Sequence, residues 1–298
     1  MTVQPASVVA ELIAVIVAVT DGQPRVLTIE GGGALPSGPF ESGHRSLQAS
    51  MRSWVERQTH HPLGYVEQLY TFADRDRTGG AAERVVSISY LGLTREARLA
   101  GEPGVGWLSW YRYFPWEDCR GVAAAMAGAV LVPPLRVWAG SDRARQHRLA
   151  VNFGQDGHRW NEELVLQRYE TMWEAGLAPE SGGGVEIPGV SMAHDHRRIL
   201  ATAIARLRAK IKYRPVVFEL MPPSFTLLQL QRAVEALAGR LLHKQNFRRL
   251  IDQQDLVEET GDMATETGGR PAKLFRFRRE ILAERAVAGT KLPLVRAV

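Results

Sequence analysis

The chain has 298 residues, enough for two ordinary domains, and its 45% hydrophobic and 23% charged residues are typical of a globular protein rather than a disordered or fibrous one. A single cysteine, Cys119, excludes an internal disulfide framework and a multi-cysteine zinc site. The longest apolar run, residues 12–19, is shorter than the ~20 residues of a membrane helix, and the start lacks the features of a signal peptide, so we expect a cytoplasmic protein without membrane association.

The formal net charge of +5 is unevenly distributed along the chain. Residues 1–193 carry 17 Lys and Arg against 21 Asp and Glu, whereas residues 194–298 carry 20 against 11. All seven tryptophans lie in the first part and all five lysines in the second. This shift indicates two domains with different partners, a small molecule for the aromatic part and a polyanion for the basic part.

The first hundred residues have the pattern of a mixed α/β domain. Short β-branched or alternating runs predict strands at residues 12–19, 26–29, 65–72 and 85–91. Leu47, Met51 and Val55 recur at helical spacing, so residues 46–59 are predicted to form an amphipathic helix. Residues 31–43, rich in glycine and proline, are predicted to be a loop.

A segment rich in tryptophan and glycine follows at about residues 101–184. Within it we predict helices near residues 116–126 and 162–175 and a strand near residues 131–138. The glycines at its end predict a flexible connection and therefore a domain boundary. We expect a first domain at residues 1–190, a second at 194–285 and a tail at 286–298.

The basic part has the element order of a winged helix-turn-helix. Helices are predicted at residues 194–211, 227–238 and 243–254, followed by strands at 256–260 and 274–277 around a glycine-containing hairpin. Thr226 and Gln229 have the spacing of a capping box at the start of the second helix. Three helices and a hairpin in a basic module are typical of DNA-binding winged helices.

The third of these helices is the candidate reader of DNA. Phe247, Leu250 and Ile251 form an apolar stripe that would hold the helix to its domain, while Asn246 and Gln245 could pair with adenine. The alternative is that the cations are ordinary solvated helix faces, as most charge runs are. The candidate DNA-binding residues are Arg206, Arg208, Lys210, Lys212, Lys244, Gln245, Asn246, Arg248, Arg249, Arg270 and Lys273.

Several segments resemble one known family, the Nudix-related transcriptional regulators of NAD metabolism (NrtR family). The C-terminal resemblance rests on LRAKIKY at 207–213, FELMP at 218–222, FTL at 225–227, NFRR at 246–249 and GGRPA at 268–272. The N-terminal resemblance rests on YVEQLYTF at 65–72 and RVVSISYL at 84–91. The segment 101–184 is not matched by shorter members and is more similar to the longer NadQ-type regulators of de novo NAD synthesis. The resemblance implies an α+β chain with an N-terminal Nudix-like α/β/α sandwich domain, carrying this segment, and a C-terminal winged helix-turn-helix domain.

The Nudix motif itself is degraded in this chain. A Nudix hydrolase uses the pattern REUxEExG, whose glutamates hold divalent cations that activate water on a diphosphate. Residues 52–59 keep Arg52, Trp54 and Glu56 but have Ser53, Arg57 and Thr59 in place of two glutamates and the glycine. Upstream, Gly38 fits and His44 replaces another glutamate. One remaining carboxylate cannot assemble a magnesium cluster, so we expect no catalytic residue, no metal site and no enzyme activity.

The resemblance implies that the Nudix-like domain instead binds an adenine nucleotide such as NAD, ADP-ribose or ATP. Arginines would contact the diphosphate and aromatic rings the base or ribose. The candidate ligand-binding residues are Arg45, Arg52, Glu56, Arg57, Tyr70, Phe72, Arg84 and Tyr90. For the aromatic residues the alternative is core packing, and for Arg52 it is bracing of the helix. The histidine pairs at 60–61 and at 194 and 196 lack further ligands, so they are interpreted as a polar loop and a helix start rather than a metal site.

The leading hypothesis is a homodimeric repressor of NAD biosynthesis genes that responds to a metabolite. Its winged helices would bind a palindromic operator in double-stranded DNA, and its catalytically inactive Nudix-like domain would bind NAD, ADP-ribose or ATP as effector. The alternative is an active Nudix-type hydrolase of ADP-ribose or a related nucleoside diphosphate derivative, using Glu41, Glu56 or Glu67. A regulator of the same architecture with an unrelated ligand is a third possibility.

Overall fold

The chain divides into two compact units. The computed structural model describes residues 8–41, 43, 45–61, 63–74, 84–97, 103–121, 126–183, 187–265, 271–278 and 280. The first unit comprises Met1–Leu220 with Ala233–Leu241, and the second comprises Met221–Arg232 with Leu242–Val298. In this described part, no helix combines the length and the apolar character that crossing a bilayer requires.

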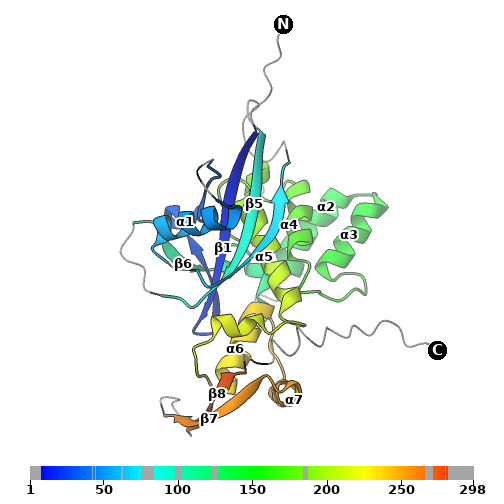
Figure 1. Ribbon diagram of the computed structural model, residues 1–298. Helices are drawn as coiled ribbons and strands as arrows, with labels where there is room; N and C mark the ends of the chain where they lie inside the picture. Colours follow the sequence, from blue (N-terminus) through cyan, green and yellow to red (C-terminus); the bar gives the residue numbers. More distant parts are fainter. Residues whose placement is uncertain are drawn as a thin grey trace, which may run out of the picture. The chain divides into compact units, whose positions relative to one another are not determined.

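A mixed six-stranded sheet forms the centre of the first unit (Figure 1). Its strands are β1 (Val8–Thr20), β2 (Gln23–Thr28), β3 (Ser37–Pro39), β4 (Tyr65–Phe72), β5 (Arg84–Leu93) and β6 (Gly106–Ser109). They are ordered β4-β5-β1-β2-β6, and β3 pairs with β1. β1 and β5 are parallel, whereas the other pairs are antiparallel. The predicted strands are therefore confirmed, and β1 and β2 form an antiparallel hairpin.

Helices cover both faces of this sheet, because β1 is apolar on both sides. Leu12, Ala14 and Ile16 pack with Met51 and Val55 of α1 (Leu47–Thr59) in one buried cluster. The alternate side chains of β1 point to the opposite face, where α5 (His196–Lys210) contacts β1 and β4. Figure 1 shows α1 and α5 with the sheet between them. The predicted amphipathic helix is confirmed and begins after Ser46, whose side chain caps it.

The predicted loop at residues 31–43 contains more regular structure than its composition suggests. A 3-10 turn occupies Glu30–Gly32, and β3 pairs with the N-terminal part of β1. Gly38 in β3 is required by a close approach, since a Cβ atom there would lie 2.2 Å from the ring of Trp54. Glycine therefore marks a contact between β3 and α1 rather than a turn.

The segment 101–184 is mostly helical. It contains α2 (Val132–Ala139), α3 (Arg143–Phe153) and α4 (Val165–Glu174). The helix predicted near 162–175 is confirmed as α4. The strand predicted near 131–138 is wrong, because two prolines fall in the first turn of α2, where a missing N–H costs no hydrogen bond. α3, which begins at the cap residue Asp142, was not predicted.

The helix predicted near residues 116–126 is also not observed as such. The described part of that range begins with a 3-10 turn at Pro115–Glu117, and a π-helical turn follows at Ala127–Leu131. Residues 122–125 lie outside the described residues.

The second unit contains the expected helix and hairpin elements. They are the N-terminal part of α6 (Leu227–Ala238), and α7 (Lys244–Gln254), β7 (Val257–Ala264) and β8 (Ala272–Phe277). β7 and β8 pair antiparallel, and Phe225 adds a bridge to Phe275. The capping box is confirmed: the Thr226 N–H donates to Gln229 Oε1 (2.7 Å) and the Gln229 N–H to Thr226 Oγ1 (3.2 Å).

The division between the units differs from the predicted boundary near residue 190. Helix α5, predicted as the first helix of the winged domain, belongs to the first unit because its buried side chains bond within that unit. Helix α6 crosses the division, with residues through Arg232 in the second unit and those from Ala233 on in the first. The predicted tail at 286–298 lies outside the described residues.

Candidate nucleic-acid interface and Nudix-like surface

Helix α7 presents cations that no carboxylate of the described residues neutralises. Phe247 is only 8% exposed and fixes the helix to its unit. Lys244, Arg248 and Arg249 are exposed, and no carboxylate among the described residues pairs with them. Free guanidinium and ammonium groups on a helix surface are the donors that contact DNA phosphates and base edges. The geometry of α7 therefore suits a polyanion.

The polar residues of α7 lie on the surface as well. Gln245 and Asn246 are exposed in the first turn, the part of a recognition helix that reaches base edges. The expected apolar stripe is only partly buried, since Leu250 is 50% exposed. It does not anchor the helix as Phe247 does, because half of its side chain stays in solvent.

The β-hairpin of the second unit carries cations that already have partners. Lys273 Nζ lies 2.8 Å from Glu259 Oε1, and Arg276 Nε lies 2.6 Å from Glu258 Oε1. These exposed ion pairs contribute little stability, so Lys273 can exchange its partner at low cost. Arg270, the predicted wing contact, lies outside the described residues.

The cations of α5 have a different environment from those of α7. Arg206 is exposed, but Arg208 is 1% and Lys210 6% exposed. Lys210 pairs with Glu67, and beyond the helix Lys212 Nζ lies 2.6 Å from Glu163 Oε1. Arg208 and Lys210 are therefore not presented to solvent as surface cations, because their charged groups are buried and already paired.

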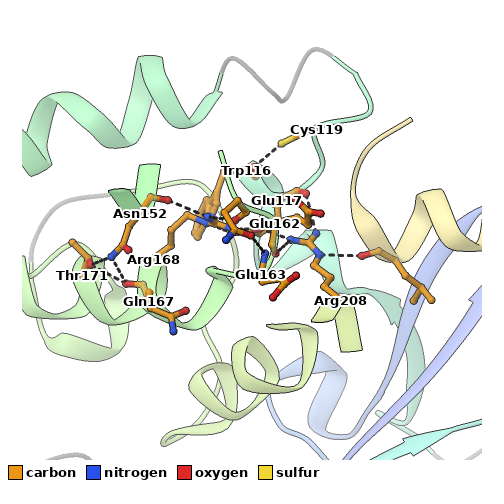
Figure 2. Close-up of polar contacts among 12 residues, drawn as sticks. Trp116, Glu117, Cys119, Asn152, Glu162, Glu163, Gln167, Arg168, Thr171 and Arg208 are labelled. Carbon is orange, nitrogen blue, oxygen red and sulfur yellow. Dashed lines mark hydrogen bonds and ion pairs between the residues drawn. The ribbon is translucent and has the colours of Figure 1, made fainter. Parts of the chain in front are cut away.

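Arg208 belongs to a buried network centred on Glu117 (Figure 2). Arg168 donates to both carboxylate oxygens of Glu117, Nε to Oε1 (2.6 Å) and Nη2 to Oε2 (2.8 Å). Arg208 Nη1 donates to the same Oε2 (2.6 Å), and its Nε donates to the Leu237 carbonyl (2.9 Å). Burial alone would raise the pKa of Glu117, but the two guanidinium groups outweigh it and hold that pKa below its usual value. This carboxylate is thus ionised and fully committed to structure.

The Nudix-like helix α1 exposes the residues that replace the lost carboxylates. Glu56 and Arg57 are exposed, and the Arg57 guanidinium stacks on Trp54 at 4.0 Å from the ring centroid. Arg52 is not free for a ligand, since it donates to the carbonyls of Leu63 (2.6 Å) and Gly64 (2.9 Å). The bracing alternative therefore describes Arg52, and Arg57 is the cation that α1 offers to solvent.

The other candidate ligand residues are scattered between surface and core. Tyr90 and Phe72 are each 4% exposed, and Tyr90 belongs to the core cluster between sheet and α1. Tyr70 is 58% exposed with its ring edge toward Phe72, and Arg45 is exposed beside the start of α1. Core packing therefore describes Phe72 and Tyr90, and Tyr70 and Arg45 remain accessible. Arg84 pairs through its backbone with Val8, and its side chain is outside the described part.

Within the described ranges, no three His, Cys, Asp or Glu side chains are grouped in a way that could bind a metal. His196 instead has a structural role, since its Nδ1 accepts the Leu35 N–H at 2.9 Å.

Some functional-looking residues were missed from the sequence. Glu117, Arg168 and Arg197 were not predicted to matter, although Arg168 and Arg197 are fully buried. A signal was present, because Arg197, Ala201, Ile204 and Arg208 follow each other at intervals of three or four and so share one helix face. That periodicity places both arginines on the buried side of α5.

With this geometry established, comparisons with known proteins define the class of fold. Residues 217–277 match the family model of the NrtR DNA-binding winged helix domain. The crystal structure of Shewanella oneidensis NrtR complexed with a 27mer DNA aligns with a TM-score of 0.57 and 21% identity, over 90% of this chain and 93% of that chain. A MutT/nudix family protein from Enterococcus faecalis aligns with a TM-score of 0.57 and 16% identity, over 93% and 89%. The fold is an N-terminal Nudix-like α/β domain followed by a winged helix, as predicted.

One curated relative is similar in sequence. The ADPR responsive transcriptional repressor NtrR of Acinetobacter baylyi is 43% identical over 88 residues, 30% of this chain. The match spans 35% of that relative, about a third of its length.

The alignment with the Shewanella structure also bears on the segment 101–184. An alignment over 90% of the chain leaves about 30 of its 298 residues uncovered, fewer than the 84 in that segment. Most of the segment therefore has a counterpart in a NrtR structure. Its presence does not by itself distinguish a longer subclass.

Proposed function

We propose that this protein is a NrtR-type transcriptional repressor that binds operator DNA through its winged helix and responds to ADP-ribose. The observation that carries the proposal is a set of exposed cations on α7, within the segment that matches a DNA-binding winged helix. Among the described residues no carboxylate pairs with these cations, Lys244, Arg248 and Arg249. Support comes from the relatives, one crystallised with a 27mer DNA and one named as ADPR responsive.

In this proposal α7 enters the major groove. Lys244, Arg248 and Arg249 contact phosphates or guanine, and Gln245 and Asn246 contact adenine edges. Arg270 and Lys273 of the hairpin and the exposed Arg206 supply further phosphate contacts. Two copies of the chain form a homodimer that reads two half-sites about one turn of DNA apart, which makes the operator palindromic. The regulated genes are those of NAD biosynthesis, as in the NadQ-type regulators that the sequence resembles.

The effector is proposed to bind the Nudix-like domain beside α1. Arg45, Arg57 and Tyr70 are its accessible contacts, with Glu56 available to a ribose hydroxyl. NAD and ATP share the adenine nucleotide with ADP-ribose and are weaker candidates, since the relative is named for ADPR. Whichever nucleotide binds, it changes operator affinity only by the difference between its affinities for the two states of the protein.

We further propose that this domain does not hydrolyse its ligand and that the protein works inside the cell. The carboxylates that would hold magnesium are replaced at Ser53 and Arg57, and the Arg57 guanidinium over Trp54 supplies fixed positive charge instead. A fixed cation binds a diphosphate but cannot activate water as a bound metal does.

The DNA proposal is tested with 27-base-pair duplexes that the wild-type protein selects from a random library. Binding is measured by fluorescence anisotropy between 50 and 200 mM salt for wild type, the double variant Arg248→Ala/Arg249→Ala, and Arg143→Ala/Arg159→Ala. The control removes two exposed arginines from the first unit. We expect the α7 variant to bind about 100-fold more weakly and the slope of log K against log salt to fall by about 2, while the control changes little.

If the α7 variant and the control bind equally well, or if the wild type enriches no sequence, the DNA proposal is wrong. The effector proposal has its own test, because all seven tryptophans lie in the first unit and Trp54 touches Arg57. ADP-ribose, NAD and ATP are titrated against tryptophan fluorescence of wild type and Arg57→Ala. We expect ADP-ribose to bind most tightly and Arg57→Ala to weaken it about tenfold. Magnesium-dependent release of AMP at turnover rates would instead establish the hydrolase.

A further inference from the structure

A cavity of about 420 Å³ lies within the first unit, away from α1 in the chain and lined by its helical segment. This volume is within the range of small-molecule sites. Its walls come from the π-helical turn, the C-terminal ends of α3 and α6, and the loop before α4. Its lining includes Gly128, Phe153, Trp160, Glu162, Gly239 and Arg240.

The aromatic wall of the cavity is held rigidly in place. The Arg168 guanidinium stacks on Trp160 at 3.9 Å from the ring centroid. Arg168 is itself fixed by Glu117 and by the carbonyls of Asn152 (3.0 Å) and Asn161 (2.9 Å), as Figure 2 shows in part. Phe153 is 2% exposed and completes the apolar surface. A preformed flat aromatic wall favours a planar ring as its partner.

The charges around the cavity leave an excess of positive charge. Glu162 is 2.9 Å from Lys212 and 3.5 Å from Arg240, so Lys212 is its closer partner. Arg240 is therefore held loosely, and 56% of its side chain is exposed. Including the buried network, the four cations Arg168, Arg208, Lys212 and Arg240 face the three carboxylates Glu117, Glu162 and Glu163. One positive charge remains, and it favours an anion in a partly desolvated site.

The two glycines that line the cavity have different surroundings. A Cβ atom added at Gly128 would meet nothing within 4 Å, whereas one at Gly239 would lie 2.3 Å from the Glu117 carbonyl. The chain thus packs tightly on the α6 side and leaves room on the side of the π-helical turn, a kind of turn that is frequent at functional sites.

We propose that this cavity binds a small aromatic acid, with a planar ring against Trp160 and Phe153 and a carboxylate or phosphate at Arg240. The site is distinct from the DNA surface and from the nucleotide surface beside α1, and it does not depend on the function proposed above. Because Gly239 and Arg240 directly follow α6, which crosses the division between the units, the ligand would sit against the end of that shared helix.

The test is isothermal titration of the full chain with three probes. Benzoate represents an aromatic carboxylate, AMP an aromatic phosphate, and benzylamine the same ring as benzoate with the opposite charge. We expect saturable binding of benzoate or AMP and none of benzylamine; the stronger of the two acids identifies the source of the anion. Arg240→Gln is expected to weaken that binding about tenfold, the effect of losing one charge-assisted hydrogen bond.

Arg136→Gln is the matched control, because Arg136 is 59% exposed and forms its own ion pair at 3.5 Å with Asp156. It should leave binding unchanged. Gly128→Phe should abolish binding by filling the free space, with circular dichroism used to confirm folding. Binding of benzylamine as tight as that of benzoate, or equal binding by the Arg240→Gln and Arg136→Gln variants, would overturn the proposal. AMP binding that survives both cavity substitutions, with no benzoate binding, would also overturn it.

Discussion

Helices α5 and α7 are both rich in arginine and lysine, yet the fold uses their charges in opposite ways. In α5, Arg197 and Arg208 are at most 1% exposed and bond to groups of the first unit. In α7, Arg248 and Arg249 are exposed, and none of the described carboxylates neutralises them. Charge density along the sequence therefore does not separate a structural helix from a binding helix. What separates them is the position of each cation relative to the apolar stripe.

Buried arginines of α4 and α5 bond to backbone carbonyls at or near helix ends. Arg208 donates to the carbonyls of Leu237 in α6 and Glu162 before α4 (3.0 Å), and Arg168 donates to that of Asn152 in α3. Last-turn carbonyls of a helix carry partial negative charge and lack helical partners, so a guanidinium there satisfies both needs. Glu117 joins the two arginines into one network. Its cost of desolvation is offset only while every partner remains in place.

The largest difference between α5 and α7 is therefore expected when one buried partner is removed. Arg208→Ala should destabilise the first unit by about 3–5 kcal/mol, because it removes one of the two cations that compensate the buried Glu117 carboxylate. It also removes the guanidinium donor from three carbonyls, those of Glu117, Glu162 and Leu237. Arg206→Ala, two residues away on the exposed face, should change stability by less than about 0.5 kcal/mol. Urea unfolding followed by tryptophan fluorescence measures both, since every tryptophan belongs to the first unit. Equal losses for the two variants would show that burial on α5 does not decide the role of its arginines.

The sequence predicted the elements whose local pattern agrees with their burial. Strand β1, helices α1 and α7 and the Thr226 cap were readable because apolar periodicity or a side-chain cap defines them locally. Helix α2 was predicted as a strand, since its β-branched and apolar run gives no helical period over so short a length and its two prolines were not recognised as first-turn residues.

The candidate site was less predictable than the fold. The net charge, the order of the predicted helices and strands, and the winged topology were enough to propose DNA-binding cations on α7. They were not enough to exclude Arg208, because its partner Glu117 lies 91 residues away in sequence and no local pattern connects the two. The same limit applies to the cavity, whose walls come from four separate stretches of chain.

A second difference between the helices is expected in their response to acid. His196 in α5 is 3% exposed, and burial, with a smaller contribution from His194, lowers its pKa to about 4 from an unfolded value of 6.5. Above pH 6.5 the His196 side chain is neutral in both the folded and the unfolded state, so its full contribution to the free energy of unfolding is present. Between pH 6.5 and 4 the unfolded chain binds a proton that the folded chain does not, so about 3 kcal/mol of stability is lost as the pH falls.

The variant His196→Asn isolates this group, because an amide oxygen can still accept the Leu35 N–H but does not titrate. Its unfolding free energy should fall less than that of wild type between pH 6.5 and 4. Burial also lowers the pKa of His61, which contributes the same sign of pH dependence to both proteins. Parallel pH profiles for variant and wild type would mean that His196 is not kept neutral by the fold.

The smallest expected effect concerns Lys244, an exposed cation of α7. Lys244→Ala should leave stability within about 0.5 kcal/mol of wild type, as expected for an exposed cation that pairs with no carboxylate in the described ranges. The same substitution should weaken DNA binding by about 1 kcal/mol and reduce the salt slope by about 1, since one phosphate contact and its released counterion are lost. Lys273→Ala is the variant to compare with it. Because Lys273 is already paired with Glu259, its substitution should lower the salt slope by less. A larger drop for Lys273 than for Lys244 would place the main phosphate contacts on the hairpin and not on α7.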